Sequence, residues 1–281
     1  MNRKNIISIR TKNSGRQIVA AADSILGSRK EQQDFAGVVV EESQAIAVVC
    51  DGMGGLEGGA LASSRAVELL ISDYQDQRPE TGFTDFLSKE AIKMDQCVAM
   101  QTNQEGNLLR GGCTMAAVIV SDGLLYWLSV GDSRIYVLRG DSMVLVTRDH
   151  NYLRMLEEAL ERGEITKDYY ENELLTKRTD ALTNYIGMGG IRRMERNANP
   201  LELMDGDMIL LCSDGLYKRL EEDQIKAMIM DNQISVQVAV RRLNRMVMDL
   251  TVKGQDNTTV VLIQYHALSE SLQYEKIQED G

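Results

Sequence analysis

Residues 45–55 read AIAVVCDGMGG, and in them an aspartate directly follows six apolar residues. The continuous apolar run 45–50 predicts a short buried strand. Asp-Gly pairs usually mark turns. No partner strand follows Asp51, however, because the sequence beyond the glycines has apolar residues at helical spacing between Val67 and Tyr74. We therefore expect Asp51 at the open end of a buried strand, where its carboxylate and the neighbouring backbone carbonyl face the edge of a sheet.

Two further aspartates stand in comparable positions. Asp214 follows the apolar run 208–213 and precedes a glycine, and Asp256 lies just before the strand-like segment 258–265. Three carboxylates at strand ends can converge on one rim, where they repel each other unless a proton or a cation lies between them. Oxygen ligands without histidine or cysteine favour Mg²⁺ or Mn²⁺ over zinc. The sequence thus predicts a divalent metal site lined by carboxylates.

The rest of the chain is dominated by short strand-like segments with short links between them. Asp122-Gly123, between two apolar runs, is typical of a hairpin turn. Such links predict antiparallel sheets rather than strand–helix–strand crossovers. Apolar residues at helical spacing around 67–74, 87–98 and 236–250 predict helices that pack on a sheet. Strands are predicted at 17–22, 35–40, 45–50, 114–121, 124–130, 134–138, 143–147, 208–213 and 258–265.

Composition excludes several classes of protein. The chain has 281 residues and a formal net charge of −11, which disfavours nucleic acid or an anionic membrane surface as a partner. Its longest apolar runs have six residues, far short of the roughly 20 that span a bilayer. The basic N-terminal segment lacks the apolar stretch of a signal peptide. Four cysteines without metal-binding spacing predict a reduced, cytoplasmic protein.

Eight motifs in a fixed order carry a resemblance to a known family. The chain resembles the bacterial-type protein phosphatase 2C family of metal-dependent serine/threonine phosphatases over about residues 20–265. The motifs are 27–34 (GSRKEQQD), 49–55 (VCDGMGG), 111–114 (GGCT), 130–136 (VGDSRIY), 147–150 (TRDH), 182–187 (LTNYIG), 211–216 (LCSDGL) and 254–258 (GQDNT).

The resemblance implies an α+β fold of four layers, with two central antiparallel sheets flanked by helices. It implies one catalytic domain over residues 1–266, with a substrate-selecting flap inserted at about 151–200. Residues 267–281 would form an acidic tail.

The resemblance also implies a centre of two Mn²⁺ or Mg²⁺ ions. Asp51 would bridge both metals, the Gly52 carbonyl would bind one of them, and Asp214 and Asp256 would complete the ligands of the other. Asp34 would hold a metal-bound water. Arg29 would bind the substrate phosphate, a task that suits its bidentate guanidinium. A water activated by the metals would attack phosphorus.

Two positions depart from the usual pattern of the family. Gln33 stands where relatives often carry an acid that binds the second metal through water, and an amide contributes less charge there. Lys218 stands where many bacterial relatives carry an aspartate that helps to bind a third metal, together with the aspartate present here as Asp132. If Lys218 points inward, we expect an ion pair with Asp132. The alternative is a surface lysine, and whether a third ion binds stays open.

The expected function is hydrolysis of phosphoserine and phosphothreonine in proteins, opposing a serine/threonine kinase, by a monomeric enzyme. Two alternatives stay open. One is a pseudophosphatase that keeps the fold and binds phosphoproteins, although intact Asp51, Asp214, Asp256 and Arg29 argue against it. The other is a metal-dependent phosphoesterase that acts on small molecules.

Overall fold

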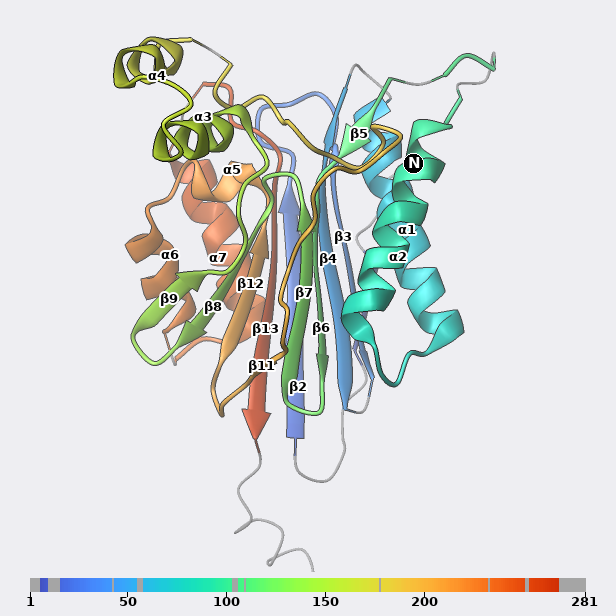
Figure 1. The fold of residues 1–281 in the computed structure, drawn as a ribbon. Coiled ribbons are helices and arrows are strands. Elements are labelled where there is room, and N and C mark those ends of the chain that lie inside the picture. The colour runs from blue at the N-terminus through green and yellow to red at the C-terminus, as the bar shows by residue number, and fades with distance from the viewer. Residues whose placement is uncertain are drawn as a thin grey trace, which may run out of the picture.

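Two β-sheets packed face to face form the centre of the structure, with helices on the outer side of each (Figure 1). The chain is described here from a computed structural model. It covers residues 6–9, 16–41, 43–54, 58–102, 106–108, 110–176, 178–231, 233–250 and 253–267. The predicted acidic tail, Ala267 aside, and Gly55 of the second motif lie outside the described residues.

The first sheet runs in the order β1-β3-β4-β6-β7-β10, with β11 also paired to β7 and β5 to β4. Its neighbouring strands are antiparallel, with the exception of β1, which pairs with β3 in parallel. The strands are β1 (Ile6–Ile9), β3 (Asp34–Glu41), β4 (Gln44–Met53), β5 (Gly112–Cys113), β6 (Met115–Ser121), β7 (Leu124–Val130), β10 (Glu195–Arg196) and β11 (Leu201–Glu202).

The second sheet is antiparallel throughout and runs in the order β2-β13-β12-β8-β9. Strands distant in sequence lie side by side in it, since β13 pairs with β2 over ten residues. The strands are β2 (Arg16–Ile25), β8 (Arg134–Arg139), β9 (Ser142–Leu145), β12 (Met208–Cys212) and β13 (Thr258–Ala267).

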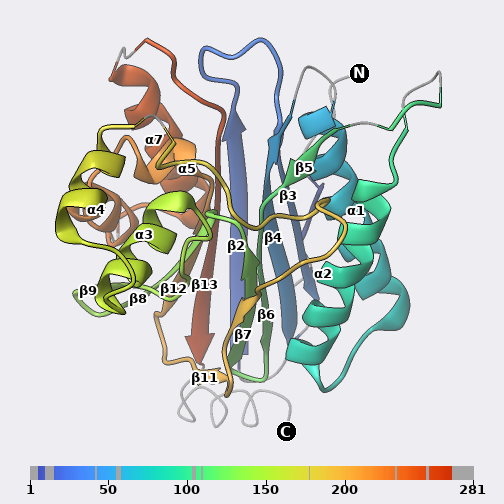
Figure 2. The same ribbon diagram turned by 45° about the horizontal axis from the view of Figure 1, so that its top comes forward.

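Helices cover the outer face of each sheet. The first sheet is covered by α1 (Gly58–Gln77) and α2 (Phe83–Ala99). The second is covered by α5 (Asp214–Tyr217), α6 (Glu222–Ile229) and α7 (Val236–Asp249). Two more helices, α3 (Tyr152–Glu161) and α4 (Lys167–Leu174), lie near one end of the second sheet, the end that comes forward in Figure 2. None of the helices in the described ranges is long and apolar enough to span a membrane.

Three layers of apolar side chains lie between the two sheets and the two layers of helices. Side chains along β4 alternate between two of these apolar layers. Ala45, Ala47 and Val49 face the layer between the two sheets. Ile46, Val48 and Cys50 face the layer under α1 and α2. A strand buried on both faces has an unbroken apolar sequence. The third apolar layer lies between the second sheet and the helices α5, α6 and α7.

The predicted α+β fold with two central antiparallel sheets and outer helices is confirmed by these layers. The nine predicted strands and three predicted helical blocks all occur, although β2 extends three residues beyond its predicted end. The parallel strand β1 and the helices α4 and α6 were not predicted, because short segments of four to eight residues carry little periodicity. The limits of the domain and of the flap remain predictions.

Replacement of Ile263 by alanine tests the layer between the sheets. Ile263 on β13 is fully buried there, so the Ile263→Ala variant is expected to lose about 2–5 kcal/mol of unfolding free energy. Urea unfolding followed by circular dichroism measures the loss. The control Val144→Ala, at a side chain that is 55% exposed on β9, is expected to change the free energy by less than about 0.5 kcal/mol. Equal losses in both variants would contradict this assignment of the core.

Candidate functional site

The aspartates singled out in the sequence come together at one end of the two sheets, the end near α5 and β5 in Figure 1. Asp34 begins β3 and is the direct register partner of Asp51 near the end of β4. Asp214 begins α5 immediately after β12, and Asp256 lies two residues before β13. Both sheets therefore contribute carboxylates to the same rim.

Asp34 is held inside the rim by a chain of hydrogen bonds. Its carboxylate is almost fully buried and accepts a hydrogen bond from Ser213 Oγ at 2.6 Å. The same hydroxyl oxygen accepts from the backbone N–H of Thr259 at 3.0 Å. Burial raises the pKa of Asp34 to about 7, with repulsion from Asp214 and Asp256 adding to it and the Ser213 hydrogen bond opposing it.

Asp51 is fixed by its backbone. Its N–H donates to Thr114 Oγ1 at 2.9 Å, and its carbonyl accepts from the N–H of Thr114 at 2.8 Å. Burial raises the pKa of Asp51 well above its usual value, and the nearby charges of Asp34, Asp214, Asp132 and Asp256 raise it further. These carboxylates thus lie close enough to repel one another.

Asp132 joins the same group from the loop before β8. It is buried, and burial together with the charge of Asp214 raises its pKa to about 7, while Lys218 opposes the shift. The raised pKa values of Asp34, Asp51 and Asp132 share one cause, because each carboxylate is removed from water beside others of the same charge. A cation at this rim would offset both the removal of the carboxylates from water and their mutual repulsion.

Two glycines allow the chain segments around the rim to approach each other. A Cβ atom on Gly215 would lie 2.0 Å from the backbone oxygen of Asn257, which joins the start of α5 to the segment before β13. A Cβ atom on Gly52 would lie 2.3 Å from the carbonyl oxygen of Gly59. The opposing atoms are backbone and have no side-chain freedom, so only glycine fits at either position.

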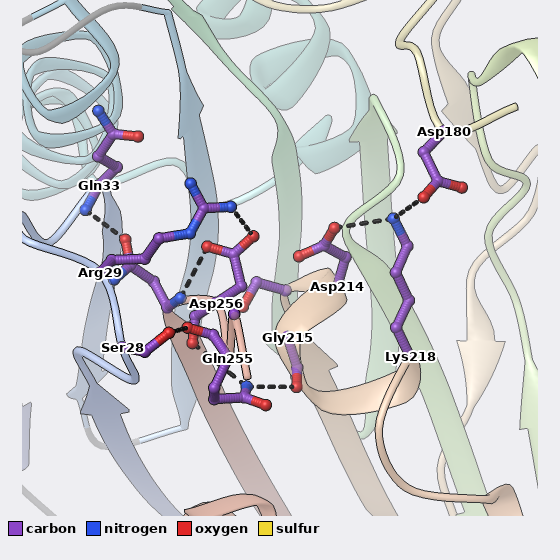
Figure 3. Close-up of polar contacts among 12 residues, drawn as sticks. Ser28, Arg29, Gln33, Asp180, Asp214, Gly215, Lys218, Gln255 and Asp256 are labelled. Atoms are coloured by element: carbon purple, nitrogen blue, oxygen red, sulfur yellow. Dashed lines mark hydrogen bonds and ion pairs between the residues drawn. The ribbon is translucent and has the colours of Figure 1, made fainter. Parts of the chain in front are cut away.

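The cationic side chains at the rim hold two of the carboxylates (Figure 3). Arg29 Nη2 lies 2.6 Å from Asp256 Oδ2. Lys218 Nζ lies 2.9 Å from Asp214 Oδ2 and 3.3 Å from Asp180 Oδ2. Burial lowers the pKa of Lys218, but the surrounding aspartates raise it by more, so the net shift is upward and the side chain is charged.

The expected ion pair between Lys218 and Asp132 is therefore wrong. Lys218 directly follows α5 and stands one turn after Asp214, so its side chain runs along the helix to the carboxylate four residues earlier. The ammonium group lowers the pKa of Asp132 only through a longer-range electrostatic interaction. Tyr217 instead donates a hydrogen bond to the backbone carbonyl of Asp132.

Gln33 contacts the rim through its backbone and through its amide. Its N–H donates to Asn257 Oδ1 at 2.8 Å, and its Nε2 donates to the carbonyl of Gly54 at 3.4 Å. The proposed role of Gln33 near a second metal stays a prediction.

The residues of the rim fit a divalent metal by their chemistry. As they stand, no three acidic, histidine or cysteine side chains of the described residues form a ready group of ligands. Asp214 and Asp256 point to Lys218 and Arg29. The available ligand atoms, however, are all oxygens, which Mg²⁺ and Mn²⁺ prefer. The carboxylates also raise each other's pKa, and a divalent cation would stabilise their charged form.

Four residues of the site were missed from the sequence. Ser213, Thr114 and Asn257 lie inside the quoted motifs, beside Asp214, Cys113 and Asp256, and their motif membership is the signal that could have identified them. Asp180 has no such signal, because its contact with Lys218 depends on how the 151–200 segment folds back.

Comparisons with known proteins identify the family of this chain. The sequence profile of the family described as Protein phosphatase 2C matches residues 23–247. A putative protein phosphatase of Mycoplasma genitalium is 30% identical over 251 residues, which cover 86% of this chain and 93% of that protein. The serine/threonine phosphatase stp of Listeria innocua is 27% identical over 249 residues, with the same coverage of both proteins.

A solved structure is similar as well. The catalytic domain of the serine/threonine protein phosphatase PstP, crystallised in complex with two manganese ions, is 25% identical and superposes with a TM-score of 0.69, covering 89% of this chain and 99% of that one.

The chain belongs to the protein phosphatase 2C family, since the profile of that family matches most of its length. The family, the fold class and the enzyme class predicted from the sequence, a protein serine/threonine phosphatase, are thereby confirmed.

Replacement of Gly215 by alanine tests the close approach at the rim. The added methyl group meets backbone that cannot move aside, so the Gly215→Ala variant is expected to lose about 2–3 kcal/mol of unfolding free energy, as in overpacked cores. Thermal unfolding measures this loss. The matched control is Gly190→Ala, where a Cβ atom meets nothing within 4 Å. A Gly215→Ala variant as stable as the control would contradict the geometry of the rim.

Proposed function

We propose that this protein removes phosphate from phosphoserine and phosphothreonine in proteins, using two Mn²⁺ or Mg²⁺ ions bound at the rim. The observation that carries the proposal is the buried group of carboxylates at the ends of both sheets, whose charges raise one another's pKa. Membership of the protein phosphatase 2C family and the manganese-bound structure of the related catalytic domain support it.

The ligands of the two ions are assigned by position. Asp51 would bridge both ions, because it is the carboxylate that interacts with all the other acidic groups of the rim. The carbonyl of Gly52 follows it at the end of β4. Asp214 and Asp256 face the rim from the second sheet, where each has one carboxylate oxygen in an ion pair, and they would bind one of the ions.

Ions held by these residues would supply an activated water as the nucleophile for phosphorus. Asp34 is too deeply buried to reach a substrate and is fixed by Ser213, so it would orient the water by accepting a hydrogen bond from it. The guanidinium of Arg29 is half exposed at the rim and can form two parallel hydrogen bonds with a phosphate. Its role is to bind the substrate and to offset charge on the phosphate oxygens.

The two alternatives differ from this proposal in what they require. A pseudophosphatase needs the fold but not the carboxylates, and the rim retains Asp51 together with Asp214 and Asp256, whose charges raise its pKa. A phosphoesterase for small molecules would use the same rim. Turnover of phosphopeptides, compared with nucleotides and phosphodiesters, distinguishes it.

The family establishes phosphorylated proteins as the substrate class, and we propose specific partners within that class. Protein phosphatases of this family act on phosphorylated proteins. We propose that the substrates include a serine/threonine kinase and its targets, and that the enzyme is a cytoplasmic monomer. The four free cysteines support a reducing compartment. Light scattering of the purified protein tests the monomer.

Removal of metal is the first test of the proposed function. Exhaustive chelation is expected to abolish hydrolysis of a phosphoserine peptide, because the nucleophile depends on the ions, and added Mn²⁺ or Mg²⁺ is expected to restore it. Phosphate release measures both steps. Full activity in chelated protein would refute a metal-dependent reaction.

Single ligands are tested by Asp214→Asn and Asp256→Asn. Each change removes one charge from the rim, so turnover is expected to fall by more than about a hundredfold, since mutation of groups that merely support metal ligands costs about 10- to 100-fold. Calorimetric titration is expected to show weaker Mn²⁺ binding, while circular dichroism shows a folded protein. The control is Asp223→Asn on α6, whose side chain is 93% exposed. Retention of a tenth of the normal turnover at saturating metal would exclude the assigned ligands.

A further inference from the structure

Lys218 connects two parts of the structure that have little else in common. Its ammonium group lies between the carboxylates of Asp214 and Asp180, 2.9 Å from one and 3.3 Å from the other (Figure 3). Asp214 begins α5 and is a proposed metal ligand. Asp180 lies in the 151–200 segment, after α4. A single side chain thus links the candidate centre to that segment.

The outer part of this segment, residues 151–182, has few other attachments. No residue of α4 is buried, and in α3 only Leu156 is buried. Among the ion pairs of the described residues, Lys218–Asp180 is the one that joins residues 151–182 to the chain outside the 151–200 segment. Among side-chain ion pairs, the position of this segment over the rim therefore depends on the contact between Lys218 and Asp180.

Asp180 is well placed to transmit this contact. The N–H of Tyr152 at the start of α3 donates to the carbonyl of Ala181 at 2.9 Å, so the residue beside Asp180 is tied to the start of the helix. Holding Asp180 consequently holds the start of α3. The other end of the contact is firm, because the Asp214 carboxylate is 20% exposed and stands one turn from Lys218 on the same helix.

We propose that Lys218 is a positioning residue that clasps the 151–182 segment, through Asp180, to the carboxylate of Asp214 and thereby sets the affinity for protein substrates. This inference rests on the proposed function, because it takes the rim as the place of reaction. A phosphorylated residue in a protein brings its neighbours against the surface around the rim. A segment held in one position binds those neighbours with a smaller loss of entropy than a loose one. A small phosphate ester has no such neighbours.

The magnitude expected of the clasp is modest. The Asp180 side chain is 68% exposed and Lys218 is 33% exposed, and ion pairs in such surroundings change an equilibrium by about two- to fivefold. The contact is also screened by salt, since the Debye length falls to about 3 Å at 1 M ionic strength. Both properties can be measured.

The variant Asp180→Asn tests the clasp without touching the proposed ligand, since Lys218 keeps Asp214. Hydrogen exchange of peptides from residues 151–182 is expected to become about two- to fivefold faster. In 1 M salt the wild-type protein is expected to approach the variant. Asp180→Glu, which keeps the charge, is expected to restore slow exchange. The matched control is Asp168→Asn, at an exposed aspartate in the same segment that has no ion pair with Lys218.

Kinetics give the second measurement. With a phosphorylated casein as substrate, Asp180→Asn is expected to raise KM about two- to fivefold and to leave kcat unchanged, whereas kcat/KM for p-nitrophenyl phosphate stays at the wild-type value. A merely structural role of Asp180 would alter both substrates together, and that result would overturn the proposal. So would an unchanged or lower KM for the protein.

A double-mutant cycle assigns the effect to the pair. Lys218→Met and the double variant Lys218→Met/Asp180→Asn are expected to exchange at the same rate, because either change alone already removes the contact. Additive effects would overturn the clasp. Hydrogen exchange needs no turnover, so a wild-type protein inactive on phosphoserine would refute the proposed function while the clasp is still tested by exchange.

Discussion

The mutual repulsion of buried carboxylates at one end of the sandwich is the constraint on which the rest of this structure depends. Two sheets bring Asp34, Asp51 and Asp132 beside Asp214 and Asp256, and burial together with like charge raises the pKa of these three groups. Such an arrangement opposes folding unless protons, hydrogen-bond donors or cations offset it. The donor is Ser213, and the cations are Arg29 and Lys218. Two divalent ions would offset the same charge and would activate a water for the proposed reaction.

The sandwich can offset the unfavourable free energy of these carboxylates because apolar layers lie on both sides of each sheet. Strand β4 is buried on both faces, and it delivers Asp51 from the middle of the first sheet to the rim. Strand β12 does the same for Asp214 from the second sheet. The catalytic end is therefore rigid where ligands are placed, with backbone contacts at Gly52 and Gly215 that admit no side chain. The segment with α3 and α4 is by contrast weakly buried, and this difference separates a fixed centre from an adjustable surface.

Lys218 joins a carboxylate of the rim to a carboxylate of the 151–200 segment. Its position one turn after Asp214 directs the ammonium to that carboxylate and to Asp180, and away from Asp132. Lys218 stays charged because its pKa is raised, whereas the occupancy of an ion site depends on the concentration of the ion. With a clasp made from a side chain, the affinity for protein substrates becomes a property of the chain itself.

The sequence by itself determined the antiparallel strands, the helices that pack on them and the aspartates at strand ends, while the four-layer arrangement was implied by the resemblance to a known family. Continuous apolar runs fix strands buried on both faces, and the motifs around Asp51, Asp214 and Asp256 place their acids at strand ends, both of which are local properties. Only the tertiary structure decided which groups offset those acids. Ser213 reaches Asp34 across 179 positions of the chain, and Asp180 reaches Lys218 because the segment before it folds back over the rim. Asp132 was wrongly predicted as the partner of an inward-pointing Lys218 for the same reason. A pattern along the chain gives the residue types near a site, but the partner of a long, flexible cation is chosen by the three-dimensional positions of all the charges around it.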